Sequence, residues 1–220
     1  MILSPILISI KVASIATIFT IILGVFLAHV FIKYEFKGKG LLEVLVTLPM
    51  VLPPSVTGYG LLILIGKKGL FGKLLYNTFG INLVFTWVAA CIAATIVSLP
   101  LMYQSCKAAF LNVNNTYENA ARTLGASEKK IFWKITLPLA IPGIISGIVL
   151  SFARAIGEFG ATLMVAGNIP GKTETIPLAI YFAVETGNTK VANTLMGVVV
   201  LFSFILIYSL NGWLKKKNYK

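Results

Sequence analysis

Aspartate is absent from this chain of 220 residues, and histidine occurs once, as His29. The only acidic residues are seven glutamates, which are scattered along the chain. With so few acids and one imidazole, the sequence shows no pairing of a nucleophile with a base and no metal-binding spacing. Enzymatic chemistry is therefore poorly supported, and we predict neither catalytic nor metal-ligating residues.

Cysteine and charge are also scarce. Cys91 and Cys106 both fall in or beside one apolar segment, so we expect packing residues and no disulfide framework. Charged residues make up 12% of the chain and hydrophobic residues 57%, and the mean hydropathy is +0.89. The surface of a soluble domain of this size would carry more charge. The expected solvent is therefore lipid.

Apolar runs predict five transmembrane helices. They lie at about 6–32, 41–65, 83–106, 139–166 and 191–214. The third and the fifth carry no charge and are each 24 residues long, which exceeds the roughly 20 residues needed to cross hydrocarbon. The other three carry one or two charges each. With no internal repeat and no soluble domain in view, residues 1–220 are predicted to form a single all-α integral membrane domain.

Basic residues are divided unequally between the two sets of alternating loops. Five lie on one side, at Lys67, Lys68, Lys73, Lys172 and Lys190. Twelve lie on the other side, at Lys33, Lys37, Lys39, Lys107, Arg122, Lys129, Lys130, Lys134, Lys215, Lys216, Lys217 and Lys220. The positive-inside rule then places the C-terminus in the cytoplasm and the N-terminus outside, although the cluster at 67–73 opposes it. The net charge of +12 follows membrane sidedness, so we predict no nucleic-acid partner.

The polar segment 107–138 has the pattern of a helix, a glycine and a second helix. Asn114 offers an N-cap oxygen, and Glu118 falls in the first turn, where a carboxylate suits the helix dipole. Gly125 suits the left-handed position just past a helix end, and Ser127 can cap the second helix. The sequence therefore predicts a short helical element at the membrane surface.

One face of this element is small and apolar, at Ala120, Ala121 and Leu124, which would let a partner approach closely. Glu118 and Arg122 could orient that partner. The alternative is an ordinary solvated loop. The Phe132–Trp133 pair argues against a loop, because aromatic residues anchor helices at the membrane interface.

Proline interrupts the second predicted span at Pro49, Pro53 and Pro54. Each proline removes a backbone donor and clashes with the preceding turn, so this helix should kink or break. Such a break survives at membrane depth only where protein or a water-filled cavity satisfies the freed carbonyls. A packing kink and a pathway wall or hinge are equally compatible with the pattern.

Two charges, Arg154 and Glu158, interrupt the fourth predicted span. Four residues apart, they would share a helix face and offset part of the ~2.5–3.5 kcal/mol that a charge costs at membrane depth. The pair either packs against a neighbouring helix or lines the route of a solute. Gly157 and Gly160 give the same segment a small flank for close helix packing.

The segment Ala166–Thr173 fits a loose phosphate-binding pattern. A nucleotide loop needs a preceding strand and free backbone N–H groups. Here a membrane span precedes the segment and Pro170 removes a donor, so we expect contact with an external protein instead.

The string Asn119–Gly125, followed after nine residues by Ile135-Thr136-Leu137-Pro138, resembles the EAA motif of ABC-importer permeases. Asn119 stands where that motif has glutamate, and Glu118 lies one residue earlier. The resemblance implies a cytoplasmic coupling helix, within about 107–138, that docks on a separate ATPase. The implied coupling residues are Glu118, Asn119, Ala120, Ala121, Arg122, Gly125, Leu137 and Pro138.

Residues 48–59 and 153–177 look like the corresponding stretches of molybdate permeases, with sulfate and tungstate permeases as close relatives. This resemblance implies a type I ABC-importer permease fold with five spans per subunit in the plasma or inner membrane. It also implies a homodimer, two ATPase copies that hold the ATP and magnesium, and an extracytoplasmic oxyanion-binding protein that contacts 66–82 and 167–190. The expected pathway or gate residues are Pro53, Pro54, Ser55, Arg154, Gly157, Glu158 and Gly160.

Two other classes of protein remain as alternatives. A secondary transporter that needs no ATPase would predict inverted repeats or more intramembrane acids, and the sequence shows neither. A membrane-embedded enzyme or assembly factor would need a reactive constellation within the spans, where only Arg154 and Glu158 are available.

Overall fold

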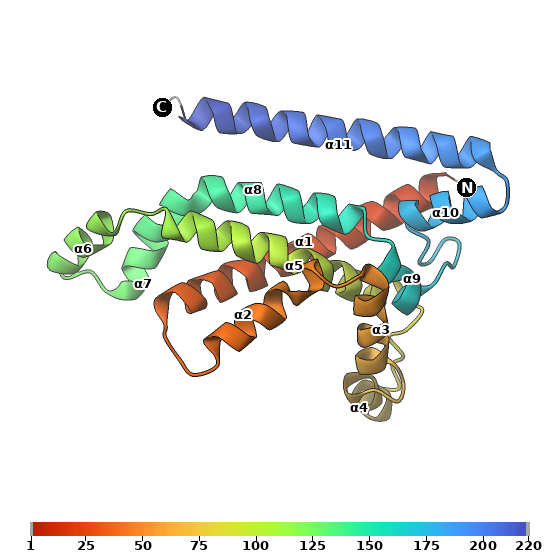
Figure 1. Ribbon diagram of the computed structural model, residues 1–220, viewed down its shortest axis with the longest axis horizontal. Helices are drawn as coiled ribbons and strands as arrows, with labels where there is room; N and C mark the ends of the chain where they lie inside the picture. The colour runs from red at the N-terminus through yellow and green to blue at the C-terminus, as the bar shows by residue number, and fades with distance from the viewer. Residues whose placement is uncertain (1, 219–220) are drawn as a thin grey trace.

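The structure is a computed structural model that describes residues 2–218, and within that range its regular elements are all helical. Four segments are long and apolar enough to cross a membrane. They are α1 (Leu3–Lys33), α5 (Trp87–Leu111), the continuous segment Glu128–Ile156, and Thr189–Leu210 of α11 (Thr189–Asn218). All four run along the long axis of the molecule (Figure 1).

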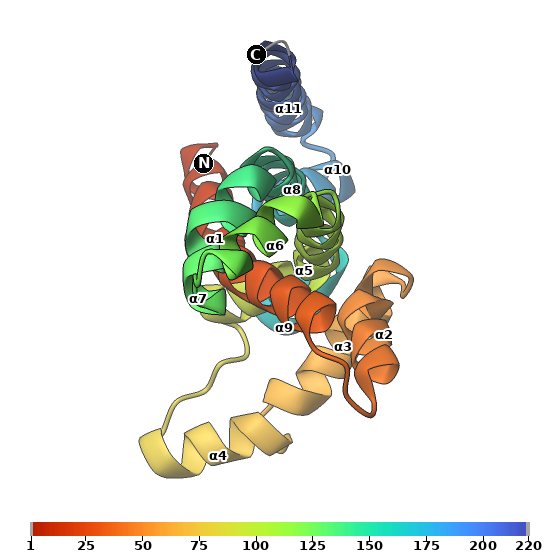
Figure 2. The same cartoon turned by 90° about the vertical axis from the view of Figure 1, so that its left-hand side faces the viewer.

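The centre of the bundle is α5, which packs against α1 and α8 (Leu137–Ile156). Its buried face is rich in small residues, among them Ala89, Ala90, Ala93 and Ala94. Small side chains allow helix axes to approach closely where lipid gives no hydrophobic drive for association. Viewed end-on, α1, α5 and α8 cluster together while α11 stands apart (Figure 2).

The second predicted span is broken, as its prolines predict. Residues Lys39–Thr47 form α2 and Leu48–Met50 form the short 3-10 helix η1; after the break, α3 (Pro54–Ile65) begins. The segment before the break and the segment after it meet at 117°. If this bent pair counts as one span, residues 2–218 contain the predicted five. A further helix, α4 (Leu70–Phe79), continues beyond α3 away from the bundle (Figures 1 and 2).

The predicted fourth span, 139–166, is wrong in its bounds. The helical segment begins at Glu128, before the predicted start, and α8 ends at Ile156. Gly157 closes it, and a separate short helix, α9 (Gly160–Ala166), follows. Within the predicted 107–138 element, α5 continues to Leu111, and the long helical segment that leads into α8 starts at Glu128.

The remaining helices are short. The polar element contains α6 (Asn115–Thr123), α7 (Glu128–Ile131) and the π-helical turn η2 (Phe132–Thr136). The short apolar run after residue 175 forms α10 (Ile176–Glu185), which is tied to α1 because the Ile176 N–H donates to Ser9 Oγ at 2.7 Å. The C-terminus and α6 lie at one end of the molecule, and the N-terminus and α10 lie at the other (Figure 1).

The lysines predicted on the cytoplasmic side near the C-terminus fall among residues that are described only in part or not at all. Lys220 lies outside the described residues, and the side chains of 215–217 are likewise not described. On the described part of α11, apolar side chains such as Phe204 and Tyr208 are 67% and 72% exposed. This helix therefore offers apolar surface that its own chain does not cover.

The two short helices that follow the breaks, α3 and α9, pack directly on each other. A Cβ at Gly58 would lie 2.7 Å from Ala161 Cα, and a Cβ at Gly160 would lie 2.9 Å from Pro54 Cβ. Contacts below 3 Å essentially never occur for real Cβ atoms, so glycine is required at both positions. The contact brings together the two regions that the sequence singled out for their prolines and glycines.

We expect Gly58→Ala to lower the thermal stability of the purified protein, because the new methyl group meets backbone of α9. Overpacking of this kind costs about 1–3 kcal/mol. The matched control is Gly60→Ala on the same helix, where nothing lies within 4 Å. There alanine should be neutral or stabilise by up to about 1 kcal/mol, from its helix propensity. Equal melting temperatures for the two variants would contradict the packing.

Candidate functional site

The helix α6 begins and ends as the sequence predicts. The side chain of Asn114 accepts a hydrogen bond from the Thr116 N–H at 2.9 Å, and Glu118 lies in the first turn. At the other end Gly125 has a φ of 78°, with the Ala126 N–H donating to Ala121 O at 3.0 Å. This arrangement is a Schellman motif, and it needs a residue that tolerates positive φ.

The predicted docking face of α6 is open. Leu124 is 87% exposed, Ala120 is exposed, and Ala121 is half-buried. At the end of this short polar helix, the Leu124 side chain is left almost uncovered by the residues that the structure describes. The surface therefore has the character of a protein contact.

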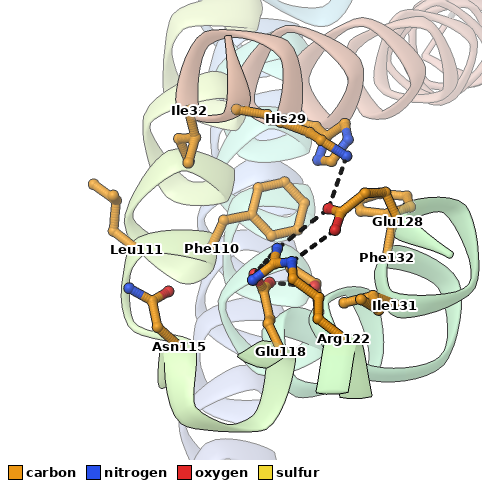
Figure 3. A pocket seen from close by; sticks show the side chains of 12 residues that line it. His29, Ile32, Phe110, Leu111, Asn115, Glu118, Arg122, Glu128, Ile131 and Phe132 are labelled. Carbon is orange, nitrogen blue, oxygen red and sulfur yellow. Dashed lines mark hydrogen bonds and ion pairs between the residues drawn. The ribbon is translucent and has the colours of Figure 1, made fainter. Parts of the chain in front are cut away.

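The opposite face of α6 is held by a network of charges (Figure 3). Glu118 accepts a hydrogen bond from Thr136 Oγ1 at 2.6 Å, and its other oxygen lies 3.2 Å from Arg122 Nη2. Arg122 Nε donates to Glu128 Oε1 at 2.6 Å, and its Nη1 donates to Asn119 Oδ1 at 2.8 Å. Hydrogen bonding to Glu128 raises the pKa of Arg122, so this guanidinium stays charged. Thus Glu118 and Arg122, expected to orient a partner, are engaged within the chain.

The network extends to α1 through Lys33, whose Nζ lies 3.2 Å from Glu128 Oε2. Around it is a cavity of about 380 Å³ between the C-terminal ends of α1 and α5 and the α6–α7 element (Figure 3). The His29 ring lies in this cavity with its centroid 4.1 Å from that of Phe132. Phe132 therefore packs inside the chain, while its neighbour Trp133 is 58% exposed.

Leu137 and Pro138 mark the start of α8. Pro138 has no N–H to donate to the turn before it, and that turn takes the wider π form. Thr136 is thereby buried against Glu118. The motif's two halves, 18 residues apart in sequence, are joined by this one hydrogen bond.

Sequence reasoning did not identify Lys33, Glu128 or Thr136 as partners of the motif. Glu128 lies six residues after Arg122, a spacing that no helix-face rule connects, and Lys33 belongs to another span. No local signal could have found these contacts, because the Gly125 turn and the packing of α1 create them.

At the second candidate site, the Arg154–Glu158 pair forms with 2.7 Å between Arg154 Nη1 and Glu158 Oε2. The expected shared helix face is wrong, since α8 ends at Ile156 and Glu158 lies in the break. Glu158 Oε1 instead accepts from the Ala161 N–H at 2.8 Å, so the carboxylate satisfies the start of α9. The Glu158 side chain is 1% exposed and that of Arg154 is 32% exposed.

This pair lies close to the proline break. Pro54 is the first residue of α3 and lies against Gly160. Its neighbours in sequence, Pro53 and Ser55, are exposed. Of the predicted pathway residues, Pro54 and Ser55 at the start of α3 thus lie beside Gly160 at the start of α9. Whether they line a route for a solute stays a prediction.

The loop after α9 does not have the geometry of a phosphate-binding loop. Thr173 Oγ1 accepts from the Ile169 N–H and donates to Gly167 O, while the N–H groups of Lys172 and Thr173 both donate to Ile169 O. The loop is closed on itself, so these groups are not free for phosphate. Among the described residues, no cluster of three or more His, Cys, Asp or Glu side chains could hold a metal ion.

Comparison with known sequences identifies the chain. Residues 20–218 match the family described as binding-protein-dependent transport system inner membrane component. The chain belongs to this family. Its members are transport components rather than enzymes, and the chain is accordingly a multi-pass inner-membrane permease subunit.

The chain is 42% identical to the molybdenum transport system permease protein ModB of Escherichia coli K12, over 96% of the chain and 92% of that protein. It is 43% identical to a putative molybdenum transport permease, YvgM, of Bacillus subtilis, over 93% and 90%. It is 35% identical to the sulfate transport permease CysT of Salmonella typhimurium, over 90% of the chain and 72% of that protein.

Solved structures confirm the predicted type I ABC-importer permease fold. An inward-facing MetNI methionine ABC transporter matches with a TM-score of 0.70 at 16% identity, over 98% of this chain and 93% of that one. A bacterial alginate ABC transporter, in complex with a periplasmic protein carrying alginate pentasaccharide, matches with 0.75 at 16%, over 96% and 77%. At these identities the likeness concerns the fold alone.

We expect Glu128→Gln to loosen the α6 element, because Lys33 and Arg122 both lose their shared carboxylate. Amide hydrogen exchange over 114–127 should become roughly two- to fivefold faster, the scale of exposed ion pairs. Glu185→Gln is the control, since Glu185 is exposed and lies at the end of α10. Unchanged exchange in Glu128→Gln would show that the network does not hold the element.

Proposed function

We propose that this chain is the permease subunit of an ATP-driven ABC importer that moves molybdate into the cell. The proposal rests on α6, which has an exposed face and is held to the rest of the chain by hydrogen bonds of Glu118 and Arg122. It also rests on the relatives of the chain, which are named as molybdenum permeases. Sulfate is the second candidate oxyanion, favoured by the more distant likeness to CysT, and tungstate is a third.

The proposed complex contains two copies of this chain, two cytoplasmic ABC ATPases and an extracytoplasmic oxyanion-binding protein. The apolar surface that α11 leaves uncovered supports a homodimer. The exposed Leu124 and Ala120 support α6 as the ATPase contact. The binding protein would contact the loops at 66–82 and 167–190. ATP and magnesium would be bound by the ATPases, and this chain would carry no cofactor.

The proposed orientation has the N-terminus outside and the C-terminus in the cytoplasm. It is supported by the basic residues at the end of the molecule that holds α6, including Lys33, Lys39 and Lys107. Their excess agrees with the positive-inside rule. This orientation puts α6 on the side of the membrane where ATP is found.

The proposed mechanism is alternating access. ATP binding would draw the two ATPases together and move the α6 elements with them. The Glu118–Thr136 hydrogen bond and the ion pairs through Glu128 would carry this motion into α8 and α1. The tight α3–α9 contact supports a rigid unit that shifts around Pro53–Ser55 and Gly157–Gly160. Arg154, half-exposed beside the buried Glu158, would meet the passing dianion.

Uptake of radiolabelled molybdate tests this function. The proteoliposomes contain this chain, its ATPase and its binding protein, and uptake should require ATP. Unlabelled tungstate or sulfate should inhibit uptake in proportion to its affinity for the binding protein. Liposomes without the ATPase are the control and should take up none. Uptake that continues without the ATPase would identify a secondary transporter instead.

Gly125→Val tests the coupling role of α6. Valine at a φ of 78° is strained, and the end of α6 should distort. We expect ATP-driven uptake to fall about tenfold, from a strain of 1–2 kcal/mol per residue, while ATP hydrolysis continues. Gly38→Val is the matched control: its φ is 88°, it too has nothing within 4 Å, and it precedes α2, outside the α6 element and outside the loops proposed for the binding protein. Normal uptake in Gly125→Val would refute docking through this turn.

A further inference from the structure

An apolar groove of about 320 Å³ lies along the seam between α1 and α5. On α1 it is lined by Ile15, Phe19 and Leu23, which follow one another every four residues on one helix face. On α5 its lining includes Trp87 and Cys91 near the start of the helix and ends at Ile96. The groove is therefore a strip that runs inward from the end of α5 nearest the N-terminus.

The groove is open to the outside of the bundle. Phe19 is 53% exposed and Leu23 is 39% exposed, so no helix of the described chain covers it. Its one hydroxyl, that of Thr95, donates to Cys91 O at 2.7 Å and offers no free donor. A ligand in this groove would meet hydrocarbon surface alone.

A cation lies at one end of the strip. Lys11 is one helical turn before Ile15 on the same stripe of α1, and its Nζ lies 3.6 Å from the centroid of the Trp87 ring. Lys11 is exposed, and none of the ion pairs found among the described residues involves it. A lysine and a tryptophan together are typical of the headgroup level of a membrane.

The length of the strip matches one leaflet. From Lys11 to Leu23 is twelve residues, or roughly 18 Å at 1.5 Å per residue. Half of the hydrocarbon core is about 15 Å. The distance from Lys11 to the far end of the strip therefore matches the distance from a lipid phosphate to the end of its acyl chain near the midplane.

We propose that this groove binds one acyl chain of an anionic phospholipid, whose phosphate contacts Lys11 in the leaflet nearest the N-terminus. The positive charge selects a headgroup of net negative charge over a zwitterionic one. The Trp87 ring holds the ammonium group over the mouth of the groove. This site is separate from α6 and from the α3–α9 contact, so lipid binding there does not depend on the solute that is transported.

Fluorescence of Trp87 reports on the groove directly. The full chain with Trp133→Phe and Trp213→Phe retains one tryptophan, at the mouth of the groove. It is reconstituted in phosphatidylcholine vesicles that contain increasing fractions of phosphatidylglycerol with brominated acyl chains, and in parallel of brominated phosphatidylcholine. Bromine quenches tryptophan on contact, so half-quenching gives the relative affinity of each lipid.

We expect half-quenching at about a fivefold lower fraction of brominated phosphatidylglycerol than of brominated phosphatidylcholine. A fivefold preference corresponds to the attraction of one lysine to an anionic surface. Lys11→Gln should remove this preference, and Lys11→Arg should keep it. Lys190→Gln is the matched control, an exposed lysine at the start of α11, and should leave this preference unchanged.

Equal quenching by both lipids in the single-tryptophan chain would show unspecific contact. Absence of quenching by either lipid would show that a second copy of the chain covers the groove. Both results would overturn the proposal.

Discussion

Hydrocarbon offers no hydrogen-bond partner to a peptide group, and the architecture of this permease follows from that constraint. Long helices satisfy the backbone on their own, and α1, α5 and α8 do so while small residues on α5 let them pack closely. The two places where the chain departs from a continuous helix need other partners. At the start of α9 the partner is the Glu158 carboxylate, whereas α3 starts with Pro54 after Pro53, and these prolines have no N–H groups to satisfy.

These two breaks lie against each other. Glycine at positions 58 and 160 brings α3 and α9 to backbone contact, so two half-helices about a hundred residues apart form one unit. At its edge Arg154 forms an ion pair with Glu158, whose side chain is almost fully buried. In an importer that works by alternating access, this unit is suited to move as a body, because neither helix can shift without displacing the other.

The proposed coupling element, α6, has two faces that differ in character. Its acid and its arginine point inward and connect α6 to α7, α8 and α1, while its apolar tip at Leu124 is left open. An element that must transmit motion needs both a surface for the partner and a stiff connection to the spans. Asn119, which stands where the resembled motif has glutamate, accepts a hydrogen bond from Arg122, and Glu118 accepts one from Thr136, the last residue of η2 before α8.

The sequence alone determined the class of protein, the apolar segments, the proline break, and the caps and left-handed glycine of α6, because each depends on composition or on residues within a few positions. It failed at the bounds of the fourth span, where Gly157 and the capping role of Glu158 end a helix that hydropathy alone would continue. Only the tertiary structure decided that Glu118 meets Thr136, that Glu128 joins Lys33 to Arg122, that α3 packs on α9, and that Lys11 stands over Trp87. These contacts join segments that no local pattern relates, and they exist because the helices pack in one particular arrangement.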